Sequence, residues 1–378
     1  MKKIFLIISF FILCKKSIAQ VTIADSFMHG GIMRTYRLYV PAIYNASNAV
    51  PVILNLHGYT SNGLQQELYG DFRPIADTAN FIIAHPDGTF DANNFRFWNT
   101  FGLSPVDDIG FLSSLLDTII AHYNVNQQRI YSTGMSNGGY MSHLLACSLG
   151  NRITAIASVT GTMTTDMKSN CTPAHPTPTM QIHGTADAVV PYTGSGVSLH
   201  IDTIVKHWVD FNNCNATPVF TAIPDIVPAD GCTAEHYLYN GGDNGATVEF
   251  YKIIGGGHTW PGAPIMAGVT NMDINASKEI WRFFSQYSLN NLATGTSDFF
   301  HSEKNQITLF PNPASGKITV RCVNDNQRQL TLYNTLGEKI LETYSTGVET
   351  TVDLPARGIY FLQIMEMNSI STHKIAAE

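Results

Sequence analysis

The hexapeptide Gly134-Met135-Ser136-Asn137-Gly138-Gly139 lies between an apolar run at residues 130–133 and an apolar stretch at 140–147. These two flanks are typical of a buried strand and of a helix. A Gly-x-Ser-x-Gly pattern between a strand and a helix indicates a nucleophile elbow, a tight turn that needs glycines at both ends and exposes the serine hydroxyl. The hexapeptide therefore predicts Ser136 as a nucleophile at the end of a buried strand, the alternative being an ordinary serine turn.

Further apolar runs occur on both sides of this hexapeptide, each followed closely by glycine, at residues 52–56, 81–84, 153–159, 179–182 and 248–254. Stretches with helical spacing of apolar residues alternate with them, at residues 109–123, 201–211 and 276–287. Continuous apolar strands that alternate with helices indicate a mostly parallel sheet with helices on both faces. The sequence therefore predicts an α/β fold, with antiparallel edge strands in the first forty residues.

The last part of the chain has a different pattern. Residues 289–306 are rich in Asn, Ser and Thr without periodicity, which predicts a linker. Six short strand-like runs follow at about ten-residue spacing, and turn residues between them predict a small all-β sandwich. We therefore expect a signal peptide at 1–19, an α/β-hydrolase domain at 20–288, the linker at 289–306 and the sandwich at 307–378.

The first nineteen residues predict export. Lys2 and Lys3 precede an apolar run at residues 4–13, and Ser17-Ile18-Ala19 matches a small-x-small cleavage site. The apolar run is shorter than the roughly twenty residues that cross a bilayer. We therefore expect a secreted protein, extracellular or on the cell surface, without a stable membrane span.

The composition narrows the possible binding partners. Charged residues make up 13% of the chain and hydrophobic residues 44%, whereas about 25% charged residues is typical of soluble proteins. This excludes a disordered polyampholyte and a coiled coil. The formal charge is −7, and four of the 22 basic residues lie in the export signal. An acidic domain is a poor ligand for phosphate backbones, so we expect no nucleic acid as a partner.

A serine hydroxyl becomes nucleophilic only beside a base, and the base needs a carboxylate to orient it. In α/β-hydrolases these residues follow one another in the order Ser, Asp, His. Asp187 comes after the run at 179–182, and His258 comes after the run at 248–254 in a glycine-rich turn. We therefore predict a catalytic triad of Ser136, Asp187 and His258. The alternatives are a loop-capping aspartate and a surface histidine.

Attack on a carbonyl creates an oxyanion, which requires N–H donors in fixed positions. We expect one donor from the backbone of Asn137, which follows the nucleophile. The other is expected from the backbone of Tyr59, which follows His57-Gly58 at the end of an earlier strand. For His57 itself we expect a structural role.

Several further residues leave alternatives open. Trp98 and Trp260 either line an acyl or sugar cleft and bind substrate, or belong to the core. Asp107 and Asp108 precede a helix, where an N-cap is favoured over a substrate contact. The sequence contains no His-Glu-x-x-His, phosphate-loop or dinucleotide glycine motif, so we expect no metal and no cofactor.

Export makes disulfides possible. Five cysteines follow the signal, and none belongs to a Cys-x-x-Cys pair, which disfavours zinc and thioredoxin-like sites. The spacing permits bridges between neighbours in the sequence, Cys147 with Cys171 and Cys214 with Cys232, and leaves Cys322 over. Alternatively, Cys147 is a small buried side chain on an apolar helix.

Six segments carry a resemblance to a known family: His57-Gly58-Tyr59, His85-Pro86-Asp87-Gly88, Val106-Asp107-Asp108-Ile109-Gly110-Phe111, Gly134-Met135-Ser136-Asn137-Gly138-Gly139, His183-Gly184-Thr185-Ala186-Asp187 and Gly257-His258-Thr259-Trp260-Pro261. In these segments the chain resembles secreted α/β-hydrolases, namely polyhydroxybutyrate depolymerases, feruloyl esterases and acetyl xylan esterases. The resemblance covers about residues 30–287. It implies carboxylic-ester hydrolysis through an acyl-enzyme and the triad named above. It also supports the pairings Cys147–Cys171 and Cys214–Cys232. Family members often carry cysteine where this chain has Tyr59, a difference that bears on the acyl pocket.

The last seventy residues resemble a type IX secretion sorting domain, on the segments Leu309-Phe310-Pro311-Asn312-Pro313-Ala314, Leu332-Tyr333-Asn334-Thr335-Leu336-Gly337, Leu354-Pro355-Ala356-Arg357-Gly358-Ile359-Tyr360 and Lys374-Ile375. The resemblance implies the secretion machinery as a partner. Such domains are usually removed outside the cell, and removal would take Cys322 with it. The rival interpretation, a carbohydrate-binding or adhesive module, lacks the exposed aromatic pattern expected of it.

The family resemblance thus implies a secreted serine esterase whose substrate is an ester linked to a polymer. A feruloyl or acetyl xylan esterase acting on plant polysaccharide is expected first, and a polyhydroxybutyrate depolymerase is the alternative. Two other classes compete with an esterase, a serine peptidase of the same fold and a non-catalytic secreted binding protein. The peptidase would need groups that bind a peptide backbone or terminal amine, and none can be read in the sequence.

Overall fold

The computed structural model describes residues 21–265, 267–293, 308–322, 325–334, 338–366 and 369–377. The chain forms two compact units, Met1–Thr296 and Ser297–Glu378, each taken here by itself. The predicted signal peptide lies outside the described residues, as do residues 294–306 of the predicted linker.

The first unit is built on a ten-stranded sheet in the order β1-β2-β4-β3-β7-β8-β9-β12-β11-β10. Its strands are β1 (Val21–His29), β2 (Ile32–Val40), β3 (Val50–Leu56), β4 (Ile82–Pro86), β7 (Val125–Met135), β8 (Ala155–Val159), β9 (Thr179–Gly184), β10 (Val219–Ala222), β11 (Thr233–Tyr239) and β12 (Val248–Ile254). The six central strands from β4 to β12 are parallel. The pairs at both edges are antiparallel. The predicted mostly parallel sheet with an antiparallel N-terminal edge is confirmed, whereas β10 and β11 were not anticipated.

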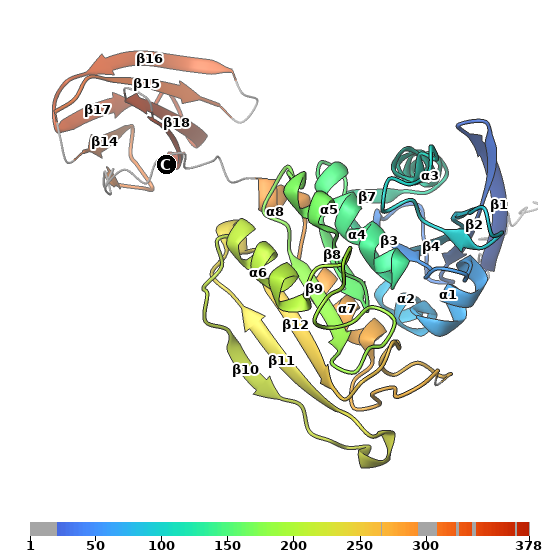
Figure 1. Cartoon of the computed structure of the whole chain (residues 1–378). Coiled ribbons are helices and arrows are strands. Elements are labelled where there is room, and N and C mark those ends of the chain that lie inside the picture. Colours follow the sequence, from blue (N-terminus) through green and yellow to red (C-terminus); the bar gives the residue numbers. More distant parts are fainter. Residues whose placement is uncertain are drawn as a thin grey trace, which may run out of the picture. The chain divides into compact units, whose positions relative to one another are not determined.

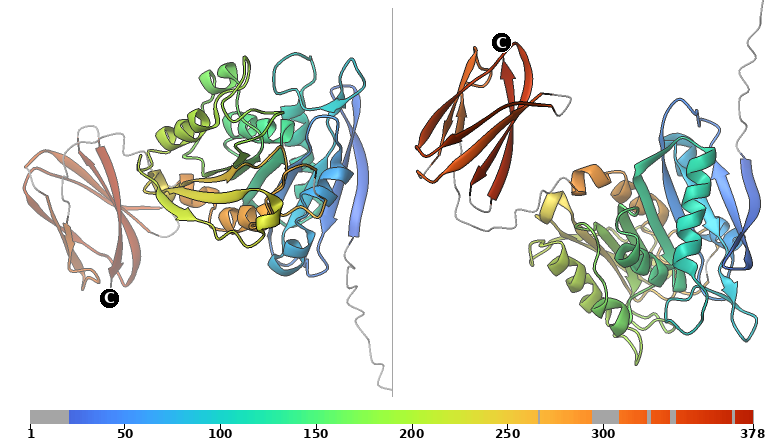
Figure 2. Two further views of the ribbon diagram at one scale, coloured as in Figure 1. Left: turned by 60° about the horizontal axis from the view of Figure 1, so that its bottom comes forward. Right: turned by 90° about the horizontal axis from the view of Figure 1, so that it is seen from above.

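Helices cover both faces of this sheet (Figures 1 and 2). On one face the core is formed with α3 (Asp108–His122), α4 (Asn137–Ser148) and α6 (Ile201–Phe211). On the other face it is formed with α2 (Arg73–Ala79) and α7 (Ala276–Phe284). The shorter elements are α1 (Gly63–Tyr69), α5 (Thr165–Ser169), the hairpin β5 (Thr89–Phe90) and β6 (Arg96–Phe97), and two 3-10 turns, Pro228–Asp230 and Asp243–Gly245. Every residue of β3 is buried, as expected for a strand with helices on both sides.

The predicted linker begins too early. Residues 289–293 form a further helix, α8 (Leu289–Ala293), instead of irregular chain. Leu289 and Leu292 are buried, and Leu292 packs in the core on the α7 side. The Leu292 carbonyl also accepts a hydrogen bond of 2.7 Å from the Asn244 side chain. Two leucines three residues apart thus hold this helix against the domain, although its polar composition suggests a linker.

The second unit consists of two small antiparallel sheets around their own core. One sheet has the order β13-β14-β17 and the other β16-β15-β18-β19. The strands are β13 (Thr308–Phe310), β14 (Lys317–Arg321), β15 (Arg328–Tyr333), β16 (Lys339–Ser345), β17 (Glu349–Asp353), β18 (Gly358–Glu366) and β19 (Ser369–Ala377). Ile318 and Val320 of one sheet share a core with Leu330 and Leu362 of the other. The predicted β-sandwich is confirmed, with β19 as an additional strand.

The cysteine predictions have different outcomes. Cys147 and Cys171 form a disulfide, with their Cα atoms 4.7 Å apart, as predicted. The prediction of a Cys214–Cys232 bridge is wrong, because both thiols are free. Cys232 precedes β11, whereas Cys214 lies near the other end of this strand, since the next residue bonds to Asn240. A seven-residue strand spans about 23 Å, far beyond the reach of a disulfide.

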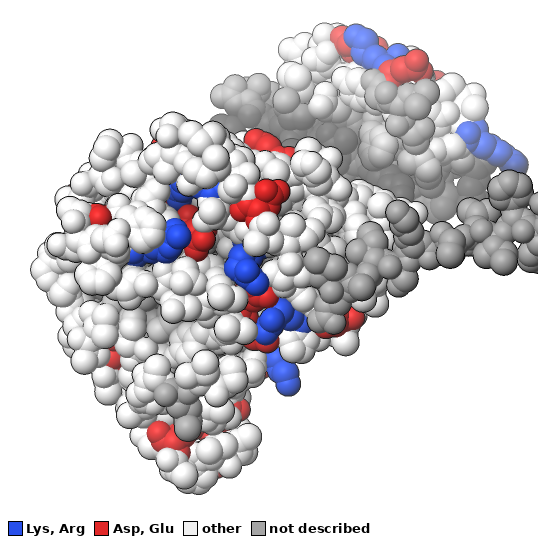
Figure 3. Space-filling model, turned by 90° about the vertical axis from the view of Figure 1, so that its right-hand side faces the viewer, with Lys and Arg blue, Asp and Glu red and all other residues white. Residues whose placement is uncertain are grey.

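The surface carries little charge. Figure 3 shows a face on which a few Lys, Arg, Asp and Glu side chains are intermixed among uncharged residues. Among the described residues, no helix is both long enough and apolar enough to cross a membrane.

Candidate active site

Ser136 occupies a sharp turn between β7 and α4. Its backbone has φ 54° and ψ −119°, a conformation that costs a non-glycine residue about 1–3 kcal/mol. The turn is held by two backbone hydrogen bonds, from the Ser136 N–H to Val159 O at 2.8 Å and from the Tyr140 N–H to Ser136 O at 3.0 Å. The strand, turn and helix that define a nucleophile elbow are all present.

Glycine is required on both sides of this turn because the backbones approach closely. A Cβ atom at Gly134 would lie 2.6 Å from the carbonyl oxygen of Leu56, and one at Gly138 would lie 2.2 Å from the same oxygen. Contacts this short would push β7 and α4 away from β3. The two glycines therefore allow the elbow to sit beside the loop that follows β3.

Asp187 and His258 lie together beyond the ends of β9 and β12. The Nδ1 atom of His258 is 2.7 Å from Oδ2 of Asp187. The other carboxylate oxygen of Asp187 accepts backbone N–H bonds from Val189 at 2.8 Å and Val190 at 2.9 Å. Because a carboxylate is the partner, Nδ1 carries the proton, and Nε2 of His258 is left able to accept one.

The Asp187 carboxylate is kept ionised. Burial by itself would raise the pKa of Asp187, but the hydrogen bond and charge of His258 together with the Val190 N–H outweigh it and lower this pKa. The Asp187 side chain is fully buried, whereas the His258 side chain retains 16% exposure. A buried anion beside a partly exposed imidazole stabilises the imidazolium form of His258.

His183 is a further member of this site that the sequence analysis did not single out. It is buried, with Nε2 2.9 Å from Val190 O and 3.4 Å from Oδ2 of Asp187. Burial lowers the pKa of His183 to about 4, so its imidazole is neutral. His183 thus supports the loop that carries Asp187, and its position four residues before Asp187 was the available signal.

Ser136 follows β7 and His258 follows β12, two strands separated by β8 and β9 whose carboxyl ends lie at the same edge of the parallel sheet. The pocket in front of Ser136 also borders Val189 and Val190 of the Asp187 loop. In the part of the chain that the structure describes, no hydrogen bond joins Ser136 to His258 directly. Bonds between a catalytic serine and its base are often long without substrate.

The two expected oxyanion donors flank Ser136. Asn137 is the first residue of α4, so its backbone N–H is among those at the helix start that no helical carbonyl accepts. The loop with Tyr59 passes beside the serine, since a Cβ atom on Gly58 would lie 3.4 Å from Ser136 Cβ. The Tyr59 side chain points away to Asp91, to which its hydroxyl donates a 2.6 Å bond.

His57 has the structural role predicted for it. Its Nε2 atom accepts the Gly88 N–H at 2.9 Å, and its Nδ1–H donates to Gly58 O at 2.7 Å. Burial lowers the pKa of His57 to about 4, so the ring is neutral and can both accept and donate. His57 thereby fixes the loop that carries the Tyr59 amide.

A hollow of about 660 Å³ opens in front of Ser136. Most of its wall is apolar or aromatic, and Asp91 is the charged residue among those that line it. The wall includes Tyr59, Phe90, Phe97, Phe101, Leu103, Tyr140, Val189 and Val197.

The two tryptophans both belong to the interior. The interpretation of Trp260 as a cleft residue is wrong, because it is buried on the side of α2 and α7. There it packs edge-on against Phe72 and donates a 3.2 Å hydrogen bond to Ser277. Trp98 is also fully buried, and it borders the hollow while its indole donates to His57 O at 3.0 Å.

The described residues include no group of three or more His, Cys, Asp or Glu side chains arranged to bind a metal ion. At the carboxyl ends of the parallel strands the structure places a serine hydroxyl at a strained turn and an imidazole bonded to a carboxylate. This arrangement is typical of serine hydrolases.

Comparison with protein families agrees with this geometry. Residues 34–192 match the family model of esterase PHB depolymerase, and residues 308–378 match that of the secretion system C-terminal sorting domain. Two separate parts of the chain are therefore similar to known families, one to an esterase family and the other to a sorting domain. The sorting domain indicates an extracellular or cell-surface location, as predicted.

Individual relatives are distant. A bifunctional acetylxylan esterase/xylanase of Neocallimastix patriciarum is 24% identical over 71% of this chain and 35% of its own length. Feruloyl esterase B of Piromyces equi is 27% identical over 58% of this chain and 41% of its own length. The chain therefore spans well under half of either relative. Among solved structures, the acetyl xylan esterase from Aspergillus awamori has a TM-score of 0.47 and 14% identity, covering 67% of this chain and 94% of that one.

Proposed function

We propose that the protein is a secreted serine esterase that hydrolyses carboxylic esters through an acyl-enzyme. The observation that carries this proposal is the 2.7 Å His258–Asp187 pair, which lies at the same carboxyl-terminal edge of the parallel sheet as the strained Ser136 elbow. The hollow bordered by Ser136 also borders the loop that follows Asp187.

In the proposed reaction, Nε2 of His258 takes the proton of the Ser136 hydroxyl as the oxygen attacks the ester carbonyl. The N–H groups of Asn137 and Tyr59 bind the oxyanion of the tetrahedral intermediate. His258 then gives its proton to the leaving alcohol, and the acyl group stays on Ser136. Water, activated by the same imidazole, attacks the acyl-enzyme and releases the acid. Asp187 keeps the His258 ring in the required tautomer throughout.

The size and lining of the hollow favour an aromatic acid over acetate. A volume of about 660 Å³ with Phe90, Phe97 and Phe101 in its wall is much larger than an acetyl group requires. We therefore place a feruloyl-type ester of plant polysaccharide first, an acetylated xylan second and polyhydroxybutyrate third. Both relatives described above are named for activities of the first two kinds.

The sorting domain completes the proposal. Residues 308–378 would bind the secretion machinery that delivers the esterase to its polymeric substrate outside the cell. This domain has a core of its own, separate from the esterase core.

The experiment that tests the activity compares methyl ferulate, acetylated xylan and polyhydroxybutyrate side by side, with wild type and Ser136→Ala. We expect hydrolysis of methyl ferulate to be fastest and Ser136→Ala to lose about 10⁶-fold in turnover while it stays folded. A fluorophosphonate should form one covalent adduct, located on Ser136 by peptide mapping. A wild-type protein that takes up no fluorophosphonate, or a Ser136→Ala variant that keeps a hundredth of the activity, would falsify the proposal.

A further inference from the structure

Two adjacent aspartates at the start of α3 have different surroundings. Asp107 caps the helix, since its carboxylate accepts the Gly110 N–H at 2.8 Å, and its side chain is 64% exposed. Asp108 points the other way and is buried, with Oδ1 2.6 Å from Nη2 of Arg34. The expected capping role therefore belongs to Asp107. Helix capping does not account for the ion pair of Asp108 with Arg34.

This ion pair is unusual in being buried at both ends. The side chains of Arg34 and Asp108 are 2% and 1% exposed. Taking two charges out of water is costly, and a buried pair is often no more stabilising than an apolar pair of the same size. The role of this ion pair must therefore be inferred from the other hydrogen bonds that its two side chains make.

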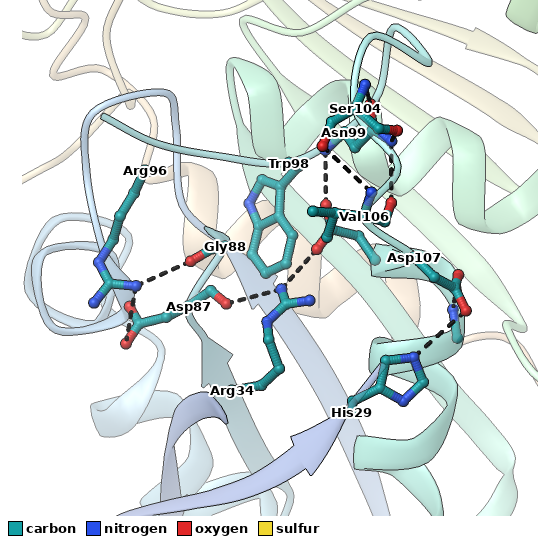
Figure 4. Close-up of polar contacts among 12 residues, drawn as sticks. His29, Arg34, Asp87, Gly88, Arg96, Trp98, Asn99, Ser104, Val106 and Asp107 are labelled. Carbon is teal, nitrogen blue, oxygen red and sulfur yellow. Dashed lines mark hydrogen bonds and ion pairs between the residues drawn. The ribbon is translucent and has the colours of Figure 1, made fainter. Parts of the chain in front are cut away.

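The second oxygen of Asp108 holds the start of a loop. It accepts the backbone N–H of Asn99 at 2.7 Å. The Asn99 side chain in turn donates to Ser104 O at 2.6 Å and to Val106 O at 3.0 Å. Figure 4 shows Arg34 extending from β2 toward the loop that carries Asn99, with Trp98 beside it. Asp108 thus ties the loop at 99–106 to the core.

The residues just before this loop contact the Asn137 side of the oxyanion site. Trp98 donates its backbone N–H to Oδ1 of Asn137 at 2.6 Å and accepts a 3.1 Å bond from Nδ2 of Asn137. Thr100 accepts a second bond from Nδ2 of Asn137, at 2.9 Å. Three hydrogen bonds therefore join residues 98–100 to the residue that follows Ser136.

The same short stretch also contacts the Tyr59 side. Arg96 O accepts the Thr60 N–H at 2.8 Å, one residue after Tyr59. The Trp98 indole donates to His57 O at 3.0 Å, two residues before Tyr59. We call residues 96–100 the bridging segment, because it bonds to both backbone stretches that carry the expected oxyanion donors.

We propose that Arg34 and Asp108 are positioning residues that hold the bridging segment, and through it the spacing between the Tyr59 and Asn137 amides. This inference rests on the function proposed above. Oxyanion donors stabilise the developing charge when they lie about 2.7–3.1 Å from the position that the oxyanion will occupy. Arg34 is itself fixed, since it packs over the Phe111 ring at 3.8 Å and donates to Asp87 O at 3.2 Å. A buried carboxylate with a hydrogen bond to each oxygen holds the Asn99 backbone in a fixed position, which a solvated loop would not do.

Two double variants separate the effect of the hydrogen bond from Asn99 to residue 108 from the effect of the two buried charges. Arg34→Met with Asp108→Asn removes both charges but keeps an oxygen that can accept the Asn99 N–H. Arg34→Met with Asp108→Leu removes the charges and the acceptor together. With a small acetate ester, we expect the Leu variant to lose about 10- to 100-fold in kcat with KM changed less than twofold. The Asn variant should stay within about fivefold of wild type.

Arg34→Lys is a third variant, for use if a double variant does not fold. It keeps a positive charge opposite Asp108, so the protein should fold. One ammonium does not reproduce the planar contacts of the guanidinium with Asp108, Asp87 and Phe111. We expect kcat to fall about 2- to 5-fold with KM unchanged. Asp107→Asn is the matched control beside the anchor, and its kcat should equal that of wild type.

The outcomes distinguish the two proposals. Ser136→Ala is measured in the same series, and activity that survives this substitution overturns the proposed function. If Ser136→Ala is inactive but kcat is unchanged in Arg34→Lys and in the folded Leu variant, the positioning role alone is overturned. Equal losses of kcat in Asp107→Asn and the anchor variants would also overturn it, because helix stability would then explain both.

Discussion

Two histidine–carboxylate pairs lie in the same domain, and the proposed mechanism assigns catalysis to one of them. In the first pair, His258 and Asp187 are 2.7 Å apart on loops beyond the strand ends. In the second, His236 of β11 and Glu249 of β12 are 2.9 Å apart across two adjacent strands. The two pairs therefore have nearly the same nitrogen–oxygen distance, and in both the carboxylate is buried and the histidine side chain is 16% exposed.

The difference lies in what else each group contacts. The other hydrogen bonds that Asp187 accepts come from the backbone N–H groups of Val189 and Val190, and no Arg or Lys is bonded to it among the described residues. Glu249 also accepts bonds from Arg282 of α7, and the His236 ring stacks on Tyr251 at 4.4 Å. A guanidinium already neutralises Glu249. We therefore propose that the pair without a competing guanidinium takes part in proton transfer and that the other pair stabilises the sheet.

The largest difference between the pairs should appear in Asp187→Asn. Loss of the negative charge favours the wrong His258 tautomer and removes the stabilisation of the imidazolium, so we expect kcat to fall about 10⁴-fold. Steady-state kinetics on methyl ferulate measure this, with thermal unfolding as the check on folding. A loss below tenfold would place the proton transfer elsewhere.

Glu249→Gln should lower the stability of the protein and leave its activity nearly unchanged. The substitution removes one of the two carboxylates bonded to Arg282, the other being Glu279, and weakens the His236 bond. We therefore expect the free energy of unfolding to fall by about 2 kcal/mol. The kcat should stay within twofold of wild type. Urea unfolding and kinetics on one preparation test both statements, and a large kinetic loss with unchanged stability would reverse the assignment of the two pairs.

The contribution of Glu249 should also depend on pH. Burial would raise the pKa of Glu249, but the hydrogen bonds from His236 and Arg282 outweigh it and lower this pKa below the usual 4.5. The unfolded chain then binds the proton more readily than the folded one. The stabilisation is therefore complete above pH 4.5 and is lost as the pH falls below it. Unfolding of wild type and Glu249→Gln across this range should give curves that converge on the acid side. Parallel curves would contradict the interpretation.

The smallest effect is expected for His236→Gln. Glu249 keeps its bonds to Arg282, so only one hydrogen bond and a ring contact are lost, worth about 1 kcal/mol of unfolding free energy. Activity should not change. His258→Gln, measured alongside, should abolish turnover at similar stability, and comparable kinetics for the two variants would mean that the pairs are not functionally different.

Much of this molecule follows from local sequence signals. The elbow at Ser136, the order of Asp187 and His258, and the alternation of apolar strands with helices can be read within a few neighbouring residues. Their cause is local as well, since a tight turn needs glycine and a strand buried on both faces needs continuous apolar residues. The division into an α/β domain and a β-sandwich followed from the same patterns.

Other features depend on contacts between distant parts of the chain. Cys214 and Cys232 are close in sequence, yet an extended strand separates them, and Trp260 lies beside His258 in sequence but faces the core. Asp107 and Asp108 are neighbours with different surroundings, because Asp107 is the non-helical N-cap of α3 whereas Asp108 is its first helical residue and meets Arg34. Such outcomes are set by which surfaces pack together, and no short stretch of residues contains that information.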